Sequence, residues 1–252
     1  LALEGAEVKM VCELLPYSSG LTRNIVQCLD DFGIPLKLNH TVVGIHGKER
    51  LEGVTIAQVG PDRKPIQRTS EFVSCDTLLL SVGLIPENEL SREAGVAIDD
   101  RTSGPLVDDC MQTSIPGVFA CGNVVHVHDL VDYVSAEGAR AGECAAGYII
   151  GSEQTNGSAI SVIAGEGVRY TVPQKVNPCN GQEKIKLFFR VTDVFRNVKI
   201  IARLDGKVIL ERKKMKAAPG EMECLEIPAS LLCSASNVTE LTVEVEMNRE
   251  VQ

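Results

Sequence analysis

The sequence has no long hydrophobic run and no visible targeting signal. A transmembrane helix needs about 18 or more consecutive apolar residues, and no segment reaches that length. The sequence does not open with a basic segment followed by an apolar one, so we expect no secretory signal. With 44% hydrophobic and 23% charged residues, the composition is that of an ordinary globular protein.

The chain also has no excess of basic residues, since 25 Lys and Arg stand against 34 Asp and Glu, for a net charge of −9. The imbalance lies in residues 1–155, with 11 basic and 22 acidic residues, whereas residues 156–252 have 14 and 12. An acidic first part without a basic stripe argues against nucleic acid as the partner. The change of balance near residue 155 indicates a domain boundary.

The nine cysteines form no C-x-x-C pair, and no group of cysteines and histidines has the spacing of a zinc site. We therefore assign no metal site. Because the cysteines are scattered through apolar stretches, we expect reduced, mostly buried thiols in a cytoplasmic protein.

A Gly-rich phosphate-binding turn is missing as well. Gly5 reads as the end of a helix, and residues 7–13 read as a strand that ends in Glu13, as in the second half of a βαβ dinucleotide unit. The glycine fingerprint should lie about 20 residues before that acid, but only 12 residues precede Glu13. We expect the chain to start inside a domain. Alternatively, Glu13 is a surface residue without a binding role.

Periodic apolar patterns predict the elements that follow in the first third of the chain. A helix over residues 21–32 would pack through an apolar stripe, and Gly33 would end it. Short strands are predicted over 36–44, 54–59 and 72–75. The continuous apolar run 77–83 predicts a strand covered on both faces, as in a parallel sheet. The stripe consists of Leu21, Ile25, Cys28, Leu29 and Phe32.

The stretch Thr113–Asn123 reads as a short buried strand and a tight glycine turn, and a helix is predicted over 130–150. Such a turn brings backbone N–H groups and a positive helix end near an anionic ligand. We interpret His126 and His128 as solvated or core histidines, with proton donation near a ligand as the alternative. We expect Asp129 to cap the helix.

The last hundred residues alternate apolar and polar positions, which is typical of short strands. The dipeptide Asp205-Gly206 predicts a two-residue hairpin, and Pro219-Gly220 predicts another turn. We read Gly151–Gly157 as a linker. About seven short strands predict a small all-β sandwich, immunoglobulin-like in outline.

Three motifs stand in order along the chain: Val-x-x-Val-x-Glu at 8–13, Thr-x-x-x-Ser-x-Gly-x-x-Pro-x-Asn at 77–88, and Thr-Ser-x-Pro-Gly-Val-Phe-Ala-x-Gly-Asn at 113–123. Together with Glu137-Gly138, they resemble the FAD-dependent pyridine-nucleotide-disulfide oxidoreductase family over about residues 1–150. The resemblance implies a partial Rossmann-like NAD(P)H-binding domain (1–86), a returning segment of the FAD-binding domain (87–152) and the β-sandwich (153–252). The Gly-rich turns that bind FAD and NAD(P)H in this family would both lie upstream of residue 1.

The resemblance assigns cofactor contacts residue by residue. Glu13 matches the acid that meets the adenosine ribose, and a carboxylate there favours NAD over NADP because it repels a 2′-phosphate. Gly83 and Pro86 match the motif beside the nicotinamide nucleotide. Gly122 would let the backbone approach FAD, unless it is only a turn glycine. Asn123 stands where the family usually has Asp, which removes a negative charge near the pyrophosphate.

Val131, Asp132 and Tyr133 match the first helical turn, whose N–H groups face the flavin. The resemblance implies hydride transfer between NAD(P)H and FAD, then electron transfer to an unidentified acceptor. No catalytic residue is assigned, and we expect this part alone to be inactive. The segment 126–133 is most similar to flavoproteins that act beside glycerol-3-phosphate or opine/amine dehydrogenase subunits. The alternative is a non-catalytic module whose β-sandwich docks a partner dehydrogenase subunit or completes a homodimer.

Overall fold

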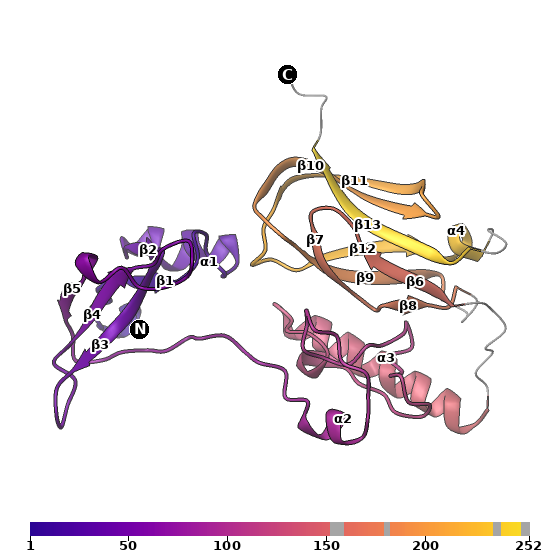
Figure 1. Cartoon of the computed structure of the whole chain (residues 1–252), viewed down its shortest axis with the longest axis horizontal. Helices are drawn as coiled ribbons and strands as arrows, with labels where there is room; N and C mark the ends of the chain where they lie inside the picture. Colours follow the sequence, from indigo (N-terminus) through magenta and orange to yellow (C-terminus); the bar gives the residue numbers. More distant parts are fainter. Residues whose placement is uncertain (152–158, 179–181, 234–237, 248–252) are drawn as a thin grey trace. The chain divides into compact units, whose positions relative to one another are not determined.

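The computed structural model describes residues 1–151, 159–178, 182–233 and 238–247. The chain forms two compact units, Leu1–Gly83 and Leu84–Gln252 (Figure 1). The predicted linker Gly151–Gly157 lies outside the described residues from position 152 onward. The predicted three-part division at residues 86 and 152 therefore stays a prediction.

The first unit is mixed α/β. Strand β1 (Val11–Glu13) pairs in parallel with β2 (Leu36–Leu38), and helix α1 (Thr22–Cys28) connects them. Asn39, with a φ of 52°, separates β2 from the next strand, so the predicted strand 36–44 is divided there. The antiparallel sheet of this unit has the order β3 (His40–His46), β4 (Gly53–Gln58), β5 (Glu71–Ser74), which confirms the other two predicted strands to within a residue.

The prediction of a buried strand over 77–83 is wrong for this structure. The segment has no regular secondary structure, and Leu79, Leu80 and Val82 are 66%, 71% and 89% exposed. A strand of a parallel sheet forms only beside neighbours that pair with its backbone. The described residues of this unit place no strand beside the segment. The apolar run therefore indicates a segment that requires packing partners, and the described residues of this unit do not supply them.

The predicted burial of the α1 stripe is also only partly correct. Leu21, Ile25 and Leu29 are half-buried, but Cys28 and Phe32 are exposed. The thiols were expected to be mostly buried, yet of the eight described cysteines only Cys110 and Cys144 are buried. Both errors have one physical reason, because periodicity identifies an apolar face without identifying what packs on it.

The second unit begins with helix α2 (Glu89–Glu93) and leads through a single 3₁₀ turn (Gly122–Val124) into the long helix α3 (Val131–Ile149). Helix α3 confirms the predicted helix 130–150. The predicted strand before Gly122 is not formed, since only an isolated bridge joins Gln112 to Phe119 and Val118 is 38% exposed.

The remainder of the second unit consists of two sheets. The antiparallel turn at Asp205-Gly206, where Leu204 pairs with Lys207, confirms the predicted hairpin. The five-stranded sheet has the order β11-β10-β13-β6-β8 and the three-stranded sheet the order β12-β9-β7. The strands are β6 (Ile160–Ala164), β7 (Val168–Val172), β8 (Lys175–Val176), β9 (Lys184–Val191), β10 (Phe195–Leu204), β11 (Lys207–Ala217), β12 (Glu223–Pro228) and β13 (Glu240–Met247), with helix α4 (Ala229–Cys233) after β12.

One hydrophobic core joins the two sheets. Phe189 and Leu187 of β9 are fully buried with Ile200 of β10 and Leu241 of β13, so residues of both sheets share this core. Strands in which apolar and polar residues alternate bury one face of their sheet in this way. The immunoglobulin-like outline stays a prediction.

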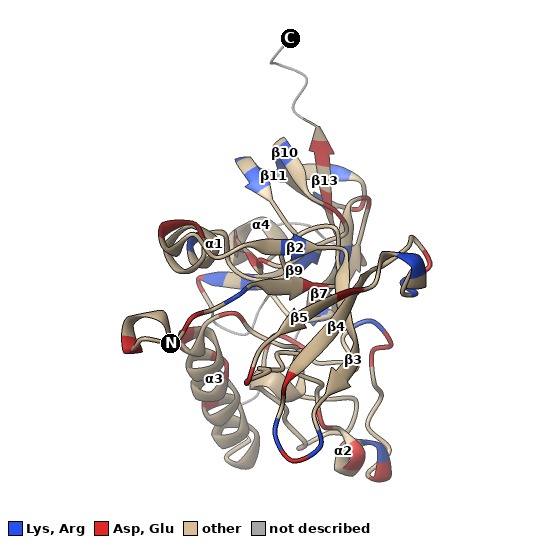
Figure 2. Cartoon of the chain, turned by 90° about the vertical axis from the view of Figure 1, so that its left-hand side faces the viewer, with Lys and Arg blue, Asp and Glu red and all other residues tan. Residues whose placement is uncertain are grey.

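The outer face of the larger sheet has interleaved charges of both signs. Figure 2 shows basic segments on β10 and β11 and acidic ones on β13. Arg203 pairs with Glu244 and Glu246, and Lys199 pairs with Glu211 at 3.4 Å. Arg203 and Lys199 are thus matched by acids of neighbouring strands. None of the described helices is long and apolar enough to cross a membrane.

Asp109 joins the segment before α3 to the β part of the second unit. Its carboxylate accepts the Asn177 N–H and the Gln182 side-chain N–H, each at 2.8 Å. Burial raises the pKa of Asp109 to about 6, although the Asn177 N–H acts in the opposite direction. The folded state therefore favours the protonated carboxyl more strongly than the unfolded chain does.

We expect a pH dependence of stability from Asp109. Between about pH 4 and pH 6 the folded state binds more protons than the unfolded state, so stability falls as the pH rises, by about 3 kcal/mol at most. Asp109→Asn should remove this slope in urea unfolding measured across the window. Asp100→Asn, at an exposed position, should keep it. An unchanged slope in Asp109→Asn would contradict the assignment.

Candidate functional site

The turn at Gly122 is held from two sides. The buried Asn88 side chain donates to the Val124 carbonyl at 2.8 Å and to the Ser103 carbonyl at 2.9 Å. The Gly122 N–H donates to Glu137 of α3 at 2.9 Å. Gly122 has a φ of 73°, and an added Cβ would lie 3.1 Å from Val134. Glycine is therefore favoured by both backbone conformation and space.

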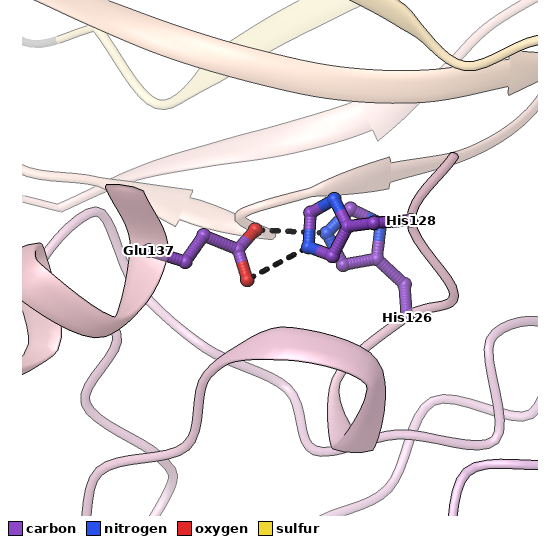
Figure 3. Close-up of side chains that lie close together, drawn as sticks. All are labelled: His126, His128 and Glu137. Atoms are coloured by element: carbon purple, nitrogen blue, oxygen red, sulfur yellow. Dashed lines mark hydrogen bonds and ion pairs between the residues drawn. The ribbon is translucent and has the colours of Figure 1, made fainter. Parts of the chain in front are cut away.

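His126, His128 and Glu137 form a buried cluster beside this turn, as Figure 3 shows. His126 Nε2 lies 2.9 Å from Glu137 Oε1 and forms a hydrogen bond with it. His128 Nε2 lies 3.0 Å from Oε2 but is not aligned as a hydrogen bond. The cluster favours the interpretation of both histidines as core residues, with a hydrogen-bond partner for His126, and it disfavours solvated histidines.

The electrostatics of the cluster follow from burial and from its own contacts. Burial lowers the pKa of His126, against the opposing effect of Glu137. Burial alone would raise the pKa of Glu137, but its contacts with the two histidines outweigh burial and hold the pKa at about 2. At neutral pH the cluster therefore contains a carboxylate and a neutral His126.

The prediction that Asp129 caps helix α3 is wrong. The N-cap is Leu130, and no side chain caps the helix. Asp129 instead accepts from Arg190 of β9 and from the Met222 N–H, each at 2.5 Å. A buried guanidinium offers a charge-assisted bond, which is stronger than a local cap. The ion pair joins the start of α3 to the β part of the unit.

Four of the predicted cofactor residues lie near this turn along the chain. Asn123 is exposed, and its Oδ1 accepts the His128 N–H at 3.1 Å. Val131 and Asp132 are exposed in the first turn of α3. Tyr133 is half-buried, with its ring 5.2 Å from the Phe188 ring, centroid to centroid.

Helix α3 has a buried face and an exposed face that includes several small residues. Glu137, Ala141 and Cys144 are buried in the unit, while the opposite face is exposed. An added Cβ at Gly138 or Gly142 would meet nothing within 4 Å. The described packing of this unit therefore does not require glycine at these two positions. The exposed face includes the small residues Ser135, Ala136, Ala139, Gly142 and Ala146.

Of the other predicted residues, Glu13 and Gly83 belong to the first unit and Pro86 to the start of the second. Glu13 is half-buried at the carboxyl end of β1, and its carboxylate accepts from the Leu15 N–H at 3.0 Å, the Ser19 N–H at 3.1 Å and the Ser19 hydroxyl at 2.5 Å. Gly83 is exposed with a φ of 90°, and Pro86 is half-buried.

Sequence reasoning assigned no site role to Asn88 or Glu137. Asn88 was part of the second motif and Glu137 of the Glu-Gly pair. Their places in these motifs were the sequence signal that could have identified them as site residues. The grouping of Glu137 with two histidines was not predicted, because it depends on how α3 packs against the segment before it.

Comparison with known proteins identifies relatives of part of the chain. Apoptosis-inducing factor 3 of Mus musculus is 35% identical over 69 residues, which cover 27% of this chain and 11% of that protein. The rubredoxin-NAD(+) reductase of Pseudomonas putida is 27% identical over 128 residues, or 51% of this chain and 29% of that protein. The NADH oxidase of Methanocaldococcus jannaschii is 26% identical over 132 residues, or 52% and 26%.

The chain thus spans less than a third of the length of each of these relatives. A solved thioredoxin reductase from Gloeobacter violaceus aligns with 54% of this chain and 42% of its own, at 17% identity and a TM-score of 0.26, a likeness too weak to support a structural argument. Residues 6–141, more than half of the chain, match the family described as pyridine nucleotide-disulphide oxidoreductase. The chain therefore belongs to the pyridine nucleotide-disulphide oxidoreductase family.

Proposed function

We propose that this chain carries one wall of the flavin site in an NAD(P)H-dependent flavoprotein oxidoreductase. The observation that carries the proposal is the Gly122 turn, which Asn88 and Glu137 hold just before the uncapped end of α3. A helix end without a side-chain cap has free N–H groups and a partial positive charge, which suit an anionic ligand.

The residues of this turn fit FAD. Gly122 keeps the backbone free of a side chain, and Asn123 exposes an amide for a ribitol hydroxyl. The first turn of α3, at Val131, Asp132 and Tyr133, would face the flavin edge with the N–H groups of Val131 and Asp132, since the Tyr133 N–H donates to the Leu130 carbonyl at 3.2 Å. When bound, FAD supplies the hydride-accepting chemistry. The protein holds and orients it. The exposed small-residue face of α3 and the exposed apolar run 77–83 suit contacts with further parts of the flavoprotein.

The absorption spectrum of the complete flavoprotein tests the proposal. Flavin bands that bleach on addition of NADH are the expected result, and a colourless complete protein would overturn it. Gly122→Val should weaken FAD retention, because it adds a side chain at a positive φ and toward Val134. Gly95→Val is the matched control, since Gly95 also has a positive φ, of 78°, and open space around it. The control separates general backbone strain from loss of the flavin contact.

Glu13 is proposed to bind the adenosine ribose of NADH. It lies at the carboxyl end of a parallel strand, where α/β sheets bind dinucleotides. The carboxylate now accepts the Ser19 hydroxyl, a contact that a ribose hydroxyl would replace with the same chemistry.

We expect Glu13→Ala to reduce the preference for NADH over NADPH about tenfold, the equivalent of one lost hydrogen bond. The ratio of kcat/KM for the two nucleotides in the complete protein measures it. Glu7→Ala, in an exposed pair with Lys9, is the control. A thermal melt of the variant shows whether loss of the Ser19 contacts has destabilised the fold. An unchanged kcat/KM ratio would show that Glu13 does not bind the ribose.

A second candidate function is docking of a partner dehydrogenase subunit, of the glycerol-3-phosphate or opine/amine class, by the β part. Met215 of β11 is 78% exposed on the outer face of the larger sheet, and methionine is common on binding surfaces. Recovery of such a subunit by the complete protein should fall with Met215→Glu. Equal recovery would remove this role.

A further inference from the structure

The cluster of His126, His128 and Glu137 has the composition and spacing of a metal site. One nitrogen from each histidine and one oxygen from Glu137 all lie within 4.8 Å of one another. In the described part of the chain this is the one group of three such side chains. In Figure 3 both imidazole rings face the same carboxylate from one side.

We propose that His126, His128 and Glu137 bind a divalent transition-metal ion, such as Zn²⁺, through two imidazole nitrogens and one carboxylate oxygen. The inference goes beyond the proposed flavin site, with which it shares Glu137. Two histidines and a glutamate are a known donor set for zinc, with one position left for water or another ligand. Imidazole favours Zn²⁺, Fe²⁺, Cu²⁺ or Ni²⁺, whereas Mg²⁺ and Ca²⁺ prefer oxygen ligands.

The distances suit such an ion. Tetrahedral coordination with bonds of about 2.0–2.1 Å places ligand atoms about 3.3 Å apart. His126 Nε2 lies 2.9 Å from Glu137 Oε1, and one ligand atom from each of the three residues lies within 4.8 Å of the other two. A small opening of the cluster, within the range of rotamer adjustment, would admit the ion.

The unpartnered ring nitrogens are a second, independent observation. The His128 side chain is 1% exposed, yet its Nε2 is not aligned to donate to the carboxylate, and both of its ring nitrogens lack a hydrogen-bond partner. A buried polar atom without a partner is unfavourable, because it has lost its hydrogen bonds to water without replacement. A metal ion bound to Nε2 would satisfy that atom through its lone pair.

The charges around the cluster do not oppose a cation. The nearby Arg190 is already neutralised by Asp129. The Glu137 carboxylate and the two imidazole rings are the groups that face the ion.

Metal titration of the chelator-stripped chain tests the proposal. Calorimetry with Zn²⁺ should give one equivalent, Co²⁺ should develop visible bands of tetrahedral coordination, and Mg²⁺ should give neither. His128→Asn and Glu137→Gln should each weaken Zn²⁺ affinity at least 100-fold. His46→Asn and Glu143→Gln, outside the cluster, should leave it unchanged. Saturable binding that His128→Asn does not change would overturn the proposal.

A measurement on the unmodified chain keeps the test decisive if a variant fails to fold. In ¹⁵N spectra that resolve the ring nitrogens of the four histidines, Zn²⁺ should shift the Nε2 signals of His126 and His128 and leave those of His40 and His46 in place. Shifts confined to the two other histidines, or no shift at one equivalent, would contradict the site.

Discussion

Glu137→Ala is expected to lower the free energy of unfolding of the second unit by about 3–5 kcal/mol, because it leaves buried donors without an acceptor. The Gly122 N–H and His126 Nε2 both donate to this carboxylate. Alanine also leaves a cavity beside the turn. Urea unfolding followed by circular dichroism, with a chelator present, gives the value without any contribution from metal binding.

Two variants show whether the effect comes from the carboxylate. Glu137→Gln retains one acceptor oxygen and should cost about half as much, since an amide nitrogen then faces a donor. Glu143→Ala changes an exposed residue of the same helix and should alter stability by less than about 0.5 kcal/mol. A cost of Glu137→Ala no larger than that of Glu143→Ala would show that the cluster does not stabilise the turn.

Arg190→Ala is expected to cost about 3–5 kcal/mol as well, because it leaves the Asp129 carboxylate buried without its partner. The side chains of the pair are 14% and 13% exposed, and the guanidinium also donates to the Val127 and Pro219 carbonyls at 3.2 Å each. Loss of the pair should loosen the start of α3 from the β part. Faster hydrogen exchange of the amides in residues 127–133 would report it.

A double-mutant cycle with Asp129→Asn separates the pair from its surroundings. The double variant should cost less than the sum of the single variants, because neither charge is then left alone. Lys184→Ala is the matched control, since its pair with Glu226 is exposed at 60% and 44% and such pairs contribute little. Additive costs in the cycle would contradict a direct coupling between Arg190 and Asp129.

The elements with strong local signals were predicted well. Helix α3 matched its apolar and small-residue pattern, and the strands of the β part matched their alternation. The Asp205-Gly206 turn followed from local chemistry, because few residues other than Gly, Asn and Asp adopt positive φ at low cost. These features depend on residues close in the chain, which is why the pattern was sufficient.

The wrong predictions concern features that depend on residues distant in the chain. The run 77–83 and the stripe of α1 were expected to be buried, but burial depends on a partner that periodicity does not identify. Asp129 was expected to cap α3 because of its position before the helix. Its actual partner, Arg190, lies 61 residues further along the chain, where no local pattern would indicate it.

By itself the sequence determined the family, through three ordered motifs, and the local elements that carry them. Only the tertiary structure decided how the Gly122 turn is held. Asn88, Glu137 and the two histidines converge on it because α3 packs along the preceding loop. The physical reason is that motifs record short-range conformation and residue type, while hydrogen-bond partners across a core depend on packing between segments distant in the chain.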